Sequence, residues 1–356
     1  MNRNIISRCG IFVIFQLLFF NLYCISQEEK NPLIKQYQKD KATYENFERQ
    51  HGHYVKTDNV LMHYLCWGNP KDTPLVWVHG SLMSAYELAP LANSLTKAGY
   101  YLIAIDYYGH GRTPNPKHEV SLYHIADDIV VLMNALKIKE AVIGGFSRGG
   151  YVASAFYQSY PQRVKGLILE DGGSVAFNSF YHRLNEKELD AKAATMNLSP
   201  ELNKLYHSSY SSEFEAYSDW YDRELGGDQF DLFALIKPLG DKWITYQGLM
   251  ENFSMANDKQ FKNLVLRPAM VPLYATSITY ISPKIIFRNL SIPVLILDPV
   301  SDNDPMPFTQ ENIQLAAAHP KFITRKEYEG VEHNIHYAKP EKFINDLTDF
   351  LLKLKK

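Results

Sequence analysis

The sequence predicts an α/β fold built on a mostly parallel sheet. Short apolar runs with the length of buried strands alternate with longer stretches of helical periodicity. The expected strands are 74–78, 100–105, 141–143, 164–169, 292–297 and 322–328, and the expected helices are 86–98, 122–136, 151–160 and a last one from 340. Because parallel strands need crossover connections, this alternation indicates a sheet with helices on both faces.

One decamer, residues 141–150, carries the strongest functional signal. It reads Ala-Val-Ile-Gly-Gly-Phe-Ser-Arg-Gly-Gly, so a strand enters a Gly-x-Ser-x-Gly pattern around Ser147 and a helix leaves it. This strand–turn–helix context is that of a nucleophile elbow, where small neighbours let the backbone turn sharply under a serine. The alternative is a glycine-rich turn that holds an ordinary serine.

Further motifs follow the other predicted strands. They are His79-Gly80, Gly109-His110-Gly111-Arg112, an acidic loop after Leu297, and His333 after the last strand. Together with the elbow they resemble the α/β-hydrolase family, over roughly residues 51–356. The resemblance implies an α/β-hydrolase fold with a mostly parallel eight-stranded sheet, helices on both faces and a helical cap insertion. It also implies a catalytic triad in the chain order serine, acid, histidine.

Ser147 and His333 are the expected nucleophile and base of that triad. A serine hydroxyl is a poor nucleophile at its free pKa and needs an adjacent base. His333 follows the last predicted strand, and the segment around it resembles the histidine loop of the family. His336 is the rival, although we expect it to pack or to form a hydrogen bond nearby.

Three aspartates compete for the acid that orients the histidine. Counting from Pro293, the position at which the family carries its acid corresponds to Asp302, which we prefer. The next proline, Pro307, comes one residue late, so Asp304 remains an alternative. Asp171 is the other, because it follows an earlier strand at which some relatives carry their acid.

The resemblance assigns the oxyanion hole to two backbone N–H groups, those of Ser81 and Arg148. Donors of this kind stabilise the charge that develops on a carbonyl oxygen. An arginine directly after the nucleophile is a departure from the uncharged residue that relatives often carry. Its guanidinium either turns outward to an acidic partner or lines the pocket and holds a substrate carboxylate.

The chain divides into four expected parts. Residues 1–26 have a basic start, a short apolar stretch and small residues before a polar switch, the pattern of a signal peptide. Residues 27–50 are expected to be a charged, solvated lead-in. The hydrolase core comprises 51–173 and 285–356, and a helical cap spans 174–284, with helices expected over 186–196, 213–224 and 242–252.

Composition excludes several other classes. The formal net charge is −2, and the absence of a basic stripe or RNA-binding motif argues against a nucleic-acid partner. Histidines such as His51 and His53 lack partners at ligand spacing, so neither a metal nor a cofactor is expected.

Cleavage after Ser26 would leave Cys66 as the single cysteine, and no stable membrane span would remain. A lipid on Cys24 is disfavoured by the bulky Tyr23 just before it.

These observations predict an exported serine hydrolase, carboxylesterase- or lipase-like, that cleaves a small-molecule ester or related acyl bond through an acyl-enzyme. The hypothesis of a different class is a non-catalytic binding protein on the same scaffold, because a fold does not fix a function.

Overall fold

The computed structural model describes residues 33–197, 200–302, 304 and 307–354. This part of the chain forms two compact units. The sheet unit comprises residues from 48 to 208 and from 245 onward, and the small unit comprises 33–47 and 209–244. The expected signal peptide, 1–26, lies outside the described residues.

The sheet unit contains the expected eight-stranded sheet, with the strand order β1-β2-β4-β3-β5-β6-β10-β11. Its strands are β1 (Gly52–Lys56), β2 (Leu61–Trp67), β3 (Thr73–Val78), β4 (Tyr100–Ile105), β5 (Ala141–Phe146), β6 (Val164–Glu170), β10 (Val294–Val300) and β11 (Ile323–Glu329). The pairs β1–β2 and β2–β4 are antiparallel, and the others are parallel. The prediction of a mostly parallel sheet is therefore confirmed.

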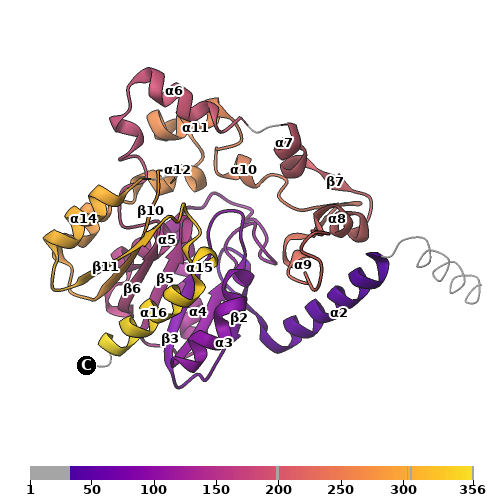
Figure 1. The fold of residues 1–356 in the computed structure, drawn as a ribbon, viewed down its shortest axis with the longest axis horizontal. Helices are drawn as coiled ribbons and strands as arrows, with labels where there is room; N and C mark the ends of the chain where they lie inside the picture. The colour runs from indigo at the N-terminus through magenta and orange to yellow at the C-terminus, as the bar shows by residue number, and fades with distance from the viewer. Residues whose placement is uncertain (1–32, 198–199, 303, 305–306, 355–356) are drawn as a thin grey trace, which may run out of the picture. The chain divides into compact units, whose positions relative to one another are not determined.

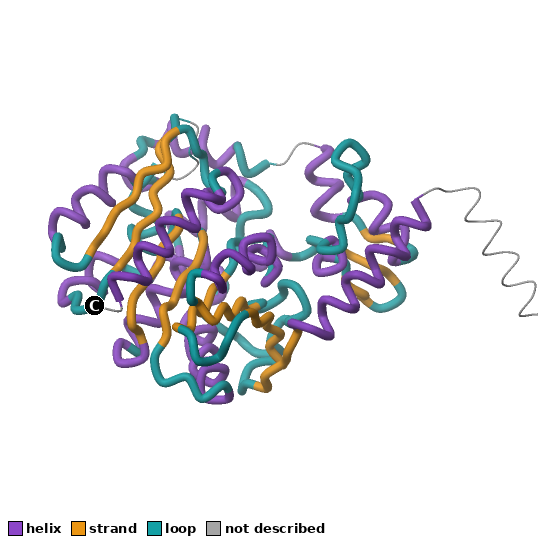
Figure 2. Tube along the Cα trace, turned by 60° about the horizontal axis from the view of Figure 1, so that its bottom comes forward, coloured by secondary structure: helices purple, strands orange, loops and turns teal. Residues whose placement is uncertain are grey.

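Helices cover both faces of this sheet. Successive side chains along a strand point to opposite sides, so the apolar strands present side chains to both faces. On one face Leu75 and Trp77 of β3 belong to a core with α3 (Ala89–Lys97) and α16 (Pro340–Leu354). On the other, Val76 and Val78 pack with α4 (Leu122–Ala135) and α5 (Arg148–Ser159). Figure 1 shows α16 crossing in front of the strands, and Figure 2 shows helices on either side of them.

Four helices of the sheet unit correspond to the predicted ones: α3 (Ala89–Lys97), α4 (Leu122–Ala135), α5 (Arg148–Ser159) and α16 (Pro340–Leu354). Two more, α14 (Thr309–Ala318) and α15 (Ile335–Ala338), were not predicted. Across the described ranges, no helix has both the length and the apolar character that crossing a membrane requires.

The insertion expected to form one helical cap is divided between the two units. The sheet unit holds α6 (Glu186–Ala194), α7 (Pro200–His207), α10 (Leu249–Asn252), α11 (Asp258–Leu266), α12 (Leu273–Tyr280) and α13 (Pro283–Ile286). The expected helix over 242–252 is confirmed only over its last residues, where α10 lies. Its first residues form a strand, in which Trp243 pairs with Tyr210 and with Pro238 across a three-stranded sheet.

The small unit contains that sheet, of β7 (Ser209–Tyr210), β8 (Lys237–Leu239) and β9 (Lys242–Ile244), with α8 (Glu213–Trp220) and α9 (Leu232–Leu235). Residues 33–47 belong to α2 (Leu33–His51). Asp40 of this helix is fully buried and accepts hydrogen bonds from the Tyr217 hydroxyl (2.6 Å) and the Gln229 N–H (3.0 Å). The expectation of a solvated lead-in over 27–50 is thus wrong for its described part, because this helix supplies part of the small unit's core.

Candidate active site

Ser147 lies in a strained turn between β5 and α5. Its backbone angles are φ 51° and ψ −119°, a left-handed conformation that an ordinary L-residue rarely adopts. A Cβ on Gly145 would lie 2.3 Å from the carbonyl carbon of Gly149, and one on Gly149 would lie 2.0 Å from the Val78 carbonyl oxygen. The turn can close only because both neighbours lack side chains, as the Gly-x-Ser-x-Gly pattern predicts.

A buried glutamate holds the loop that follows β3. The Gly80 N–H donates to Glu87 Oε2 (2.9 Å), and Trp77 Nε1 donates to Glu87 Oε1 (2.7 Å). Burial raises the pKa of the Glu87 carboxyl to about 7. The Tyr107 hydroxyl donates to the Gly80 carbonyl (3.1 Å). Sequence reasoning missed Glu87, whose position in a predicted helix gave no sign of this contact.

Ser81 and Arg148, the two expected oxyanion-hole residues, line the same cavity as Ser147. Ser81 follows the anchored loop, and Arg148 is the first residue of α5. Within the described part of the chain, neither backbone N–H donates a hydrogen bond. The positive end of the α5 dipole adds to the favourable field for a negative charge at this place.

His333 contacts the carboxylate of Asp171, not that of Asp302. A hydrogen bond joins His333 Nδ1 to Asp171 Oδ2. Asp171 directly follows β6, has a positive φ of 40°, and donates its N–H to the Leu297 carbonyl of β10 (3.1 Å). The carboxylate is therefore held at the end of the sheet, beside the strand that leads to Ser147.

The aspartates of the loop after β10 have other environments. Asp302, the preferred acid in the sequence analysis, is exposed and makes no hydrogen bond to His333 in the described structure. Asp298 accepts from Asn312 (2.7 Å) and from Arg325 Nε (2.6 Å). The preference for Asp302 thus does not fit the geometry, because the loop carries this residue outward while the end of β6 already supplies a carboxylate.

Asp304 lies close to the His333–Asp171 pair. One potential ligand atom from each of these three residues lies within 4.8 Å of the others. Within this group His333 Nδ1 and Asp171 Oδ2 are joined by a hydrogen bond, and Asp304 is a second carboxylate beside that pair.

His336, the rival base, is committed elsewhere. It is buried, and both its backbone N–H (2.9 Å) and its Nδ1 (2.7 Å) bind Glu170. The ring of Phe146 lies 4.7 Å from that of His333 and 5.3 Å from that of His336. The expectation that His336 forms a hydrogen bond nearby is confirmed.

The pKa values of the His333–Asp171 pair are shifted in the same direction. Burial raises the pKa of the Asp171 carboxyl, the bond to His333 offsets this in part, and the negative charge of Asp304 adds to the rise. For His333 burial acts to lower the pKa, but the hydrogen bond and charge of Asp171, with Asp304 behind it, raise it above the ordinary value. The arrangement stabilises the imidazolium that forms when a histidine accepts a proton.

The residues of this site line one cavity of about 270 Å³. Its walls combine Ser147 and His333 with a mostly apolar set from the two parts of the insertion in the sheet unit; the lining residues on that side are Phe177, Tyr181, Lys192, Thr195, Met196, Met250, Phe253, Met255 and Ile278. The size suits a small molecule.

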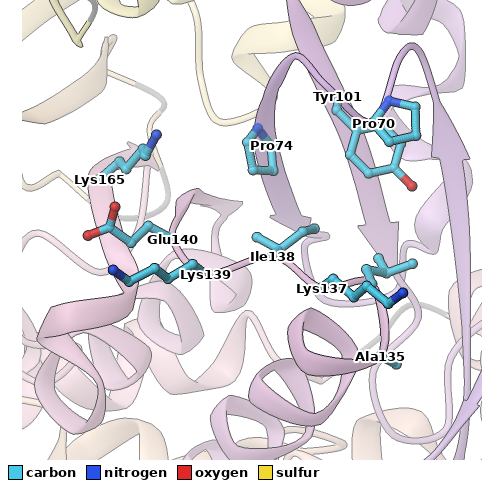
Figure 3. Close-up of a pocket in the computed structure, with 10 residues that line it drawn as sticks. Pro70, Pro74, Tyr101, Ala135, Lys137, Ile138, Lys139, Glu140 and Lys165 are labelled. Atoms are coloured by element: carbon cyan, nitrogen blue, oxygen red, sulfur yellow. The ribbon is translucent and has the colours of Figure 1, made fainter.

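A larger depression of about 540 Å³ lies elsewhere, among Pro74, Tyr101, Lys165 and the segment 135–140 (Figure 3). Pro74 and Tyr101 lie near the amino ends of their strands, as does Lys165. Ligands of open α/β sheets bind at the carboxyl ends, where Ser147, Asp171 and His333 gather. The smaller cavity is therefore the candidate active site.

The chain belongs to the α/β-hydrolase family. The family described as "alpha/beta hydrolase fold" matches residues 73–340. This match includes the elbow, the Asp171 turn and the His333 loop.

Individual relatives match over shorter stretches. The AB hydrolase superfamily protein YisY of Bacillus subtilis is 28% identical over 128 residues, 35% of this chain and 47% of that protein. The bifunctional esterase/perhydrolase DCH of Acinetobacter calcoaceticus is 30% identical over 111 residues, 31% of this chain and 40% of that protein. The match thus covers less than half the length of each of these relatives.

Solved structures agree with the fold. Carboxylesterase CesB of Bacillus subtilis superposes with a TM-score of 0.57 at 16% identity, over 89% of this chain and 98% of its own. At this identity the likeness shows the fold alone, and the sequence relatives, a hydrolase superfamily protein and an esterase/perhydrolase, support a hydrolase.

Replacing Asp304 with asparagine should lower the pKa of His333, because it removes a negative charge that favours the imidazolium. NMR titration of protein labelled with ¹⁵N-histidine measures this, with the His333 signal assigned by its loss in His333→Gln. Asp302→Asn, which removes the same charge from the same loop, is the control and should shift the pKa less. A larger shift in the control would mean that Asp302 is the closer carboxylate.

Proposed function

We propose that this protein is a serine hydrolase in which Ser147 is the nucleophile, His333 the general base and Asp171 the acid. The observation that carries this proposal is the hydrogen bond between Asp171 and His333 Nδ1, on a histidine that lines the same cavity as the strained Ser147. The Nδ1 bond leaves Nε2 of His333 as the atom that can exchange a proton with the serine hydroxyl.

The reaction follows from these positions. Ser147 Oγ attacks the substrate carbonyl while His333 Nε2 accepts its proton, and the N–H groups of Ser81 and Arg148 receive the negative charge on the carbonyl oxygen. His333 then gives the proton to the leaving alcohol, and an acyl-enzyme remains. Water, activated by the same histidine, attacks this ester, releases the acid and returns the proton to Ser147.

Ser147 Oγ donates no hydrogen bond to His333 in the described structure. Catalytic hydrogen bonds of this kind are often long in the free enzyme and tighten when substrate binds. Ser147 is partly exposed in the cavity that His333 also lines, and we expect the contact to form when substrate binds.

Asp171 takes the role for which the sequence favoured Asp302. Its carboxylate is nearly fully buried, and its backbone N–H donates to the Leu297 carbonyl, which holds the residue in place at the end of β6. Such a group sets the tautomer of the histidine and stabilises its charged form without itself moving. The neighbouring Asp304 adds negative charge, but a bond to the imidazole is made by Asp171.

Esters of small carboxylic acids are the proposed substrates. The cavity is small and mostly apolar away from the triad, and one of the matched relatives is named an esterase/perhydrolase. Hydrolysis that depends on Ser147 would separate this proposal from the hypothesis of a non-catalytic binding protein.

Ser147→Ala should reduce hydrolysis of 4-nitrophenyl acetate or butyrate by at least about 1,000-fold, because the acyl-enzyme can no longer form. Ser159→Ala, an exposed serine at the far end of the same helix, is the control and should retain full activity. Rates of 4-nitrophenol release decide this. A Ser147→Ala enzyme within about tenfold of the wild type would contradict the proposed mechanism.

Asp171→Asn should lose far more of kcat than Asp302→Asn, although each substitution removes one negative charge. An amide at position 171 presents the wrong partner to His333 Nδ1, whereas position 302 is exposed. Steady-state kinetics on the same ester, with circular dichroism to verify folding, compares the two. If Asp302→Asn is the crippled variant, the acid is Asp302 and the assignment of Asp171 falls.

We also propose that residues 1–26 direct export and are removed, on the sequence pattern of this segment. The mature protein should then begin near Gln27 and be recovered outside the cytoplasm. Intact-mass measurement of the exported protein tests this. A mass that still includes residues 1–26 would contradict cleavage, and an added lipid on Cys24 would indicate a lipoprotein.

A further inference from the structure

Arg148 places a buried positive charge beside the nucleophile. Its side chain is 2% exposed, although it lines the cavity next to Ser147. Two contacts fix the guanidinium: Nε donates to Ser81 Oγ (3.2 Å), and the group lies 4.1 Å from the centre of the Phe253 ring. The arginine therefore has a defined position in the wall of the active site.

This charge has no carboxylate partner. No acidic residue in the described part of the chain forms an ion pair with Arg148, and its buried Nη1 atom has no hydrogen-bond partner there. Burial accordingly lowers the pKa of the guanidinium, and the titratable groups that act on it are three phenols, those of Tyr107, Tyr151 and Tyr274. Of the two orientations considered from sequence, an outward turn to an acid is excluded for the described residues.

The rest of the described cavity wall carries no negative charge. Lys192 of α6 lines it as a second, partly exposed cation, and the lining set contains no aspartate or glutamate. Burying a cation without a partner is costly, and a planar carboxylate bound to a guanidinium in two parallel hydrogen bonds offsets that cost. The unpaired charge and the unused Nη1 donor of Arg148 thus match an anion supplied by the substrate.

We propose that Arg148 is a specificity-determining residue that binds a free carboxylate on the acyl part of the substrate, so that the enzyme prefers monoesters of short dicarboxylic acids. The inference rests on the proposed function, because the carboxylate is placed relative to the acyl carbonyl at Ser147. The backbone N–H of Arg148 faces the carbonyl oxygen, and the side chain of the same residue binds the second carboxylate. A short acyl chain is therefore required between the two groups.

The hydrolysis balances without any further reactant. Ser147 Oγ forms the new bond to the ester carbonyl carbon, the bond to the alcohol oxygen breaks, and His333 passes the proton to that oxygen. Water then cleaves the acyl-enzyme, and the dicarboxylic acid leaves. The carboxylate bound to Arg148 keeps its charge throughout and takes no part in bond formation.

The test compares two 4-nitrophenyl esters that differ in one charge: the hemisuccinate and its neutral methyl ester. The wild type should hydrolyse the hemisuccinate with a kcat/KM at least about tenfold higher, and in Arg148→Met this ratio should fall to about one. The ratio is decisive because loss of the contact to Ser81 would slow both substrates alike. Arg148→Lys keeps the charge and should restore part of the ratio.

Lys192→Met is the matched control, since it removes the other cation of the cavity wall. Because Lys192 is partly exposed, we expect it to change the ratio less than Arg148→Met does. A wild-type ratio near one, or a ratio that Arg148→Met leaves unchanged, would overturn the proposal.

A binding measurement separates this proposal from the proposed function. Calorimetry on Ser147→Ala should detect monomethyl succinate and should find dimethyl succinate at least about tenfold weaker, with the difference lost in the Ser147→Ala, Arg148→Met double variant. If neither ester is hydrolysed by the wild type but this difference is present, the hydrolase proposal fails and the carboxylate site stands. Equal binding of the two succinates would overturn the site.

Discussion

The backbone turn at Ser147 is the constraint on which the rest of the site depends. The chain passes so close to itself at Gly145 and Gly149 that a Cβ at either would overlap backbone atoms. The turn that holds Ser147 at φ 51° can therefore close only because both positions are glycine. The strain is held by the sheet, since the Ser147 N–H donates to the Glu170 carbonyl of the next strand (2.9 Å). One turn therefore places a hydroxyl, a helix N-terminus and the side chain of Arg148 at a single edge of the sheet.

The other parts of the site are placed by the ends of neighbouring strands. The loop after β3 is held through Gly80 by Glu87, and Asp171 at the end of β6 is held by the Leu297 carbonyl. His333 follows β11 and reaches Asp171 across β10, which lies between β6 and β11. Because parallel strands end at the same edge, the topology of the sheet brings residues that are distant in sequence together there.

The sequence predicted the strands and the elbow at this edge of the sheet better than it predicted the partner of His333 or the small unit. Local patterns are sufficient for the elbow and for the strand–helix alternation, because both depend on neighbouring residues. The sequence favoured Asp302 as the acid, whereas the structure pairs His333 with Asp171. Both aspartates follow strands, and which carboxylate reaches His333 depends on the path of a loop. The pairing of residues 33–47 with 209–244 was also missed, since a buried Asp40 bonded to Tyr217 leaves no local pattern.

The central claim is that Ser147 is an activated nucleophile, and trapping it tests this most directly. Incubation of the folded protein with a fluorophosphonate, followed by intact mass and peptide mapping, measures both the extent and the position of labelling. The account predicts one adduct per chain, located on Ser147 and absent from protein in which His333 is replaced by alanine. Folded protein that stays unlabelled, or an adduct on another serine, would contradict it.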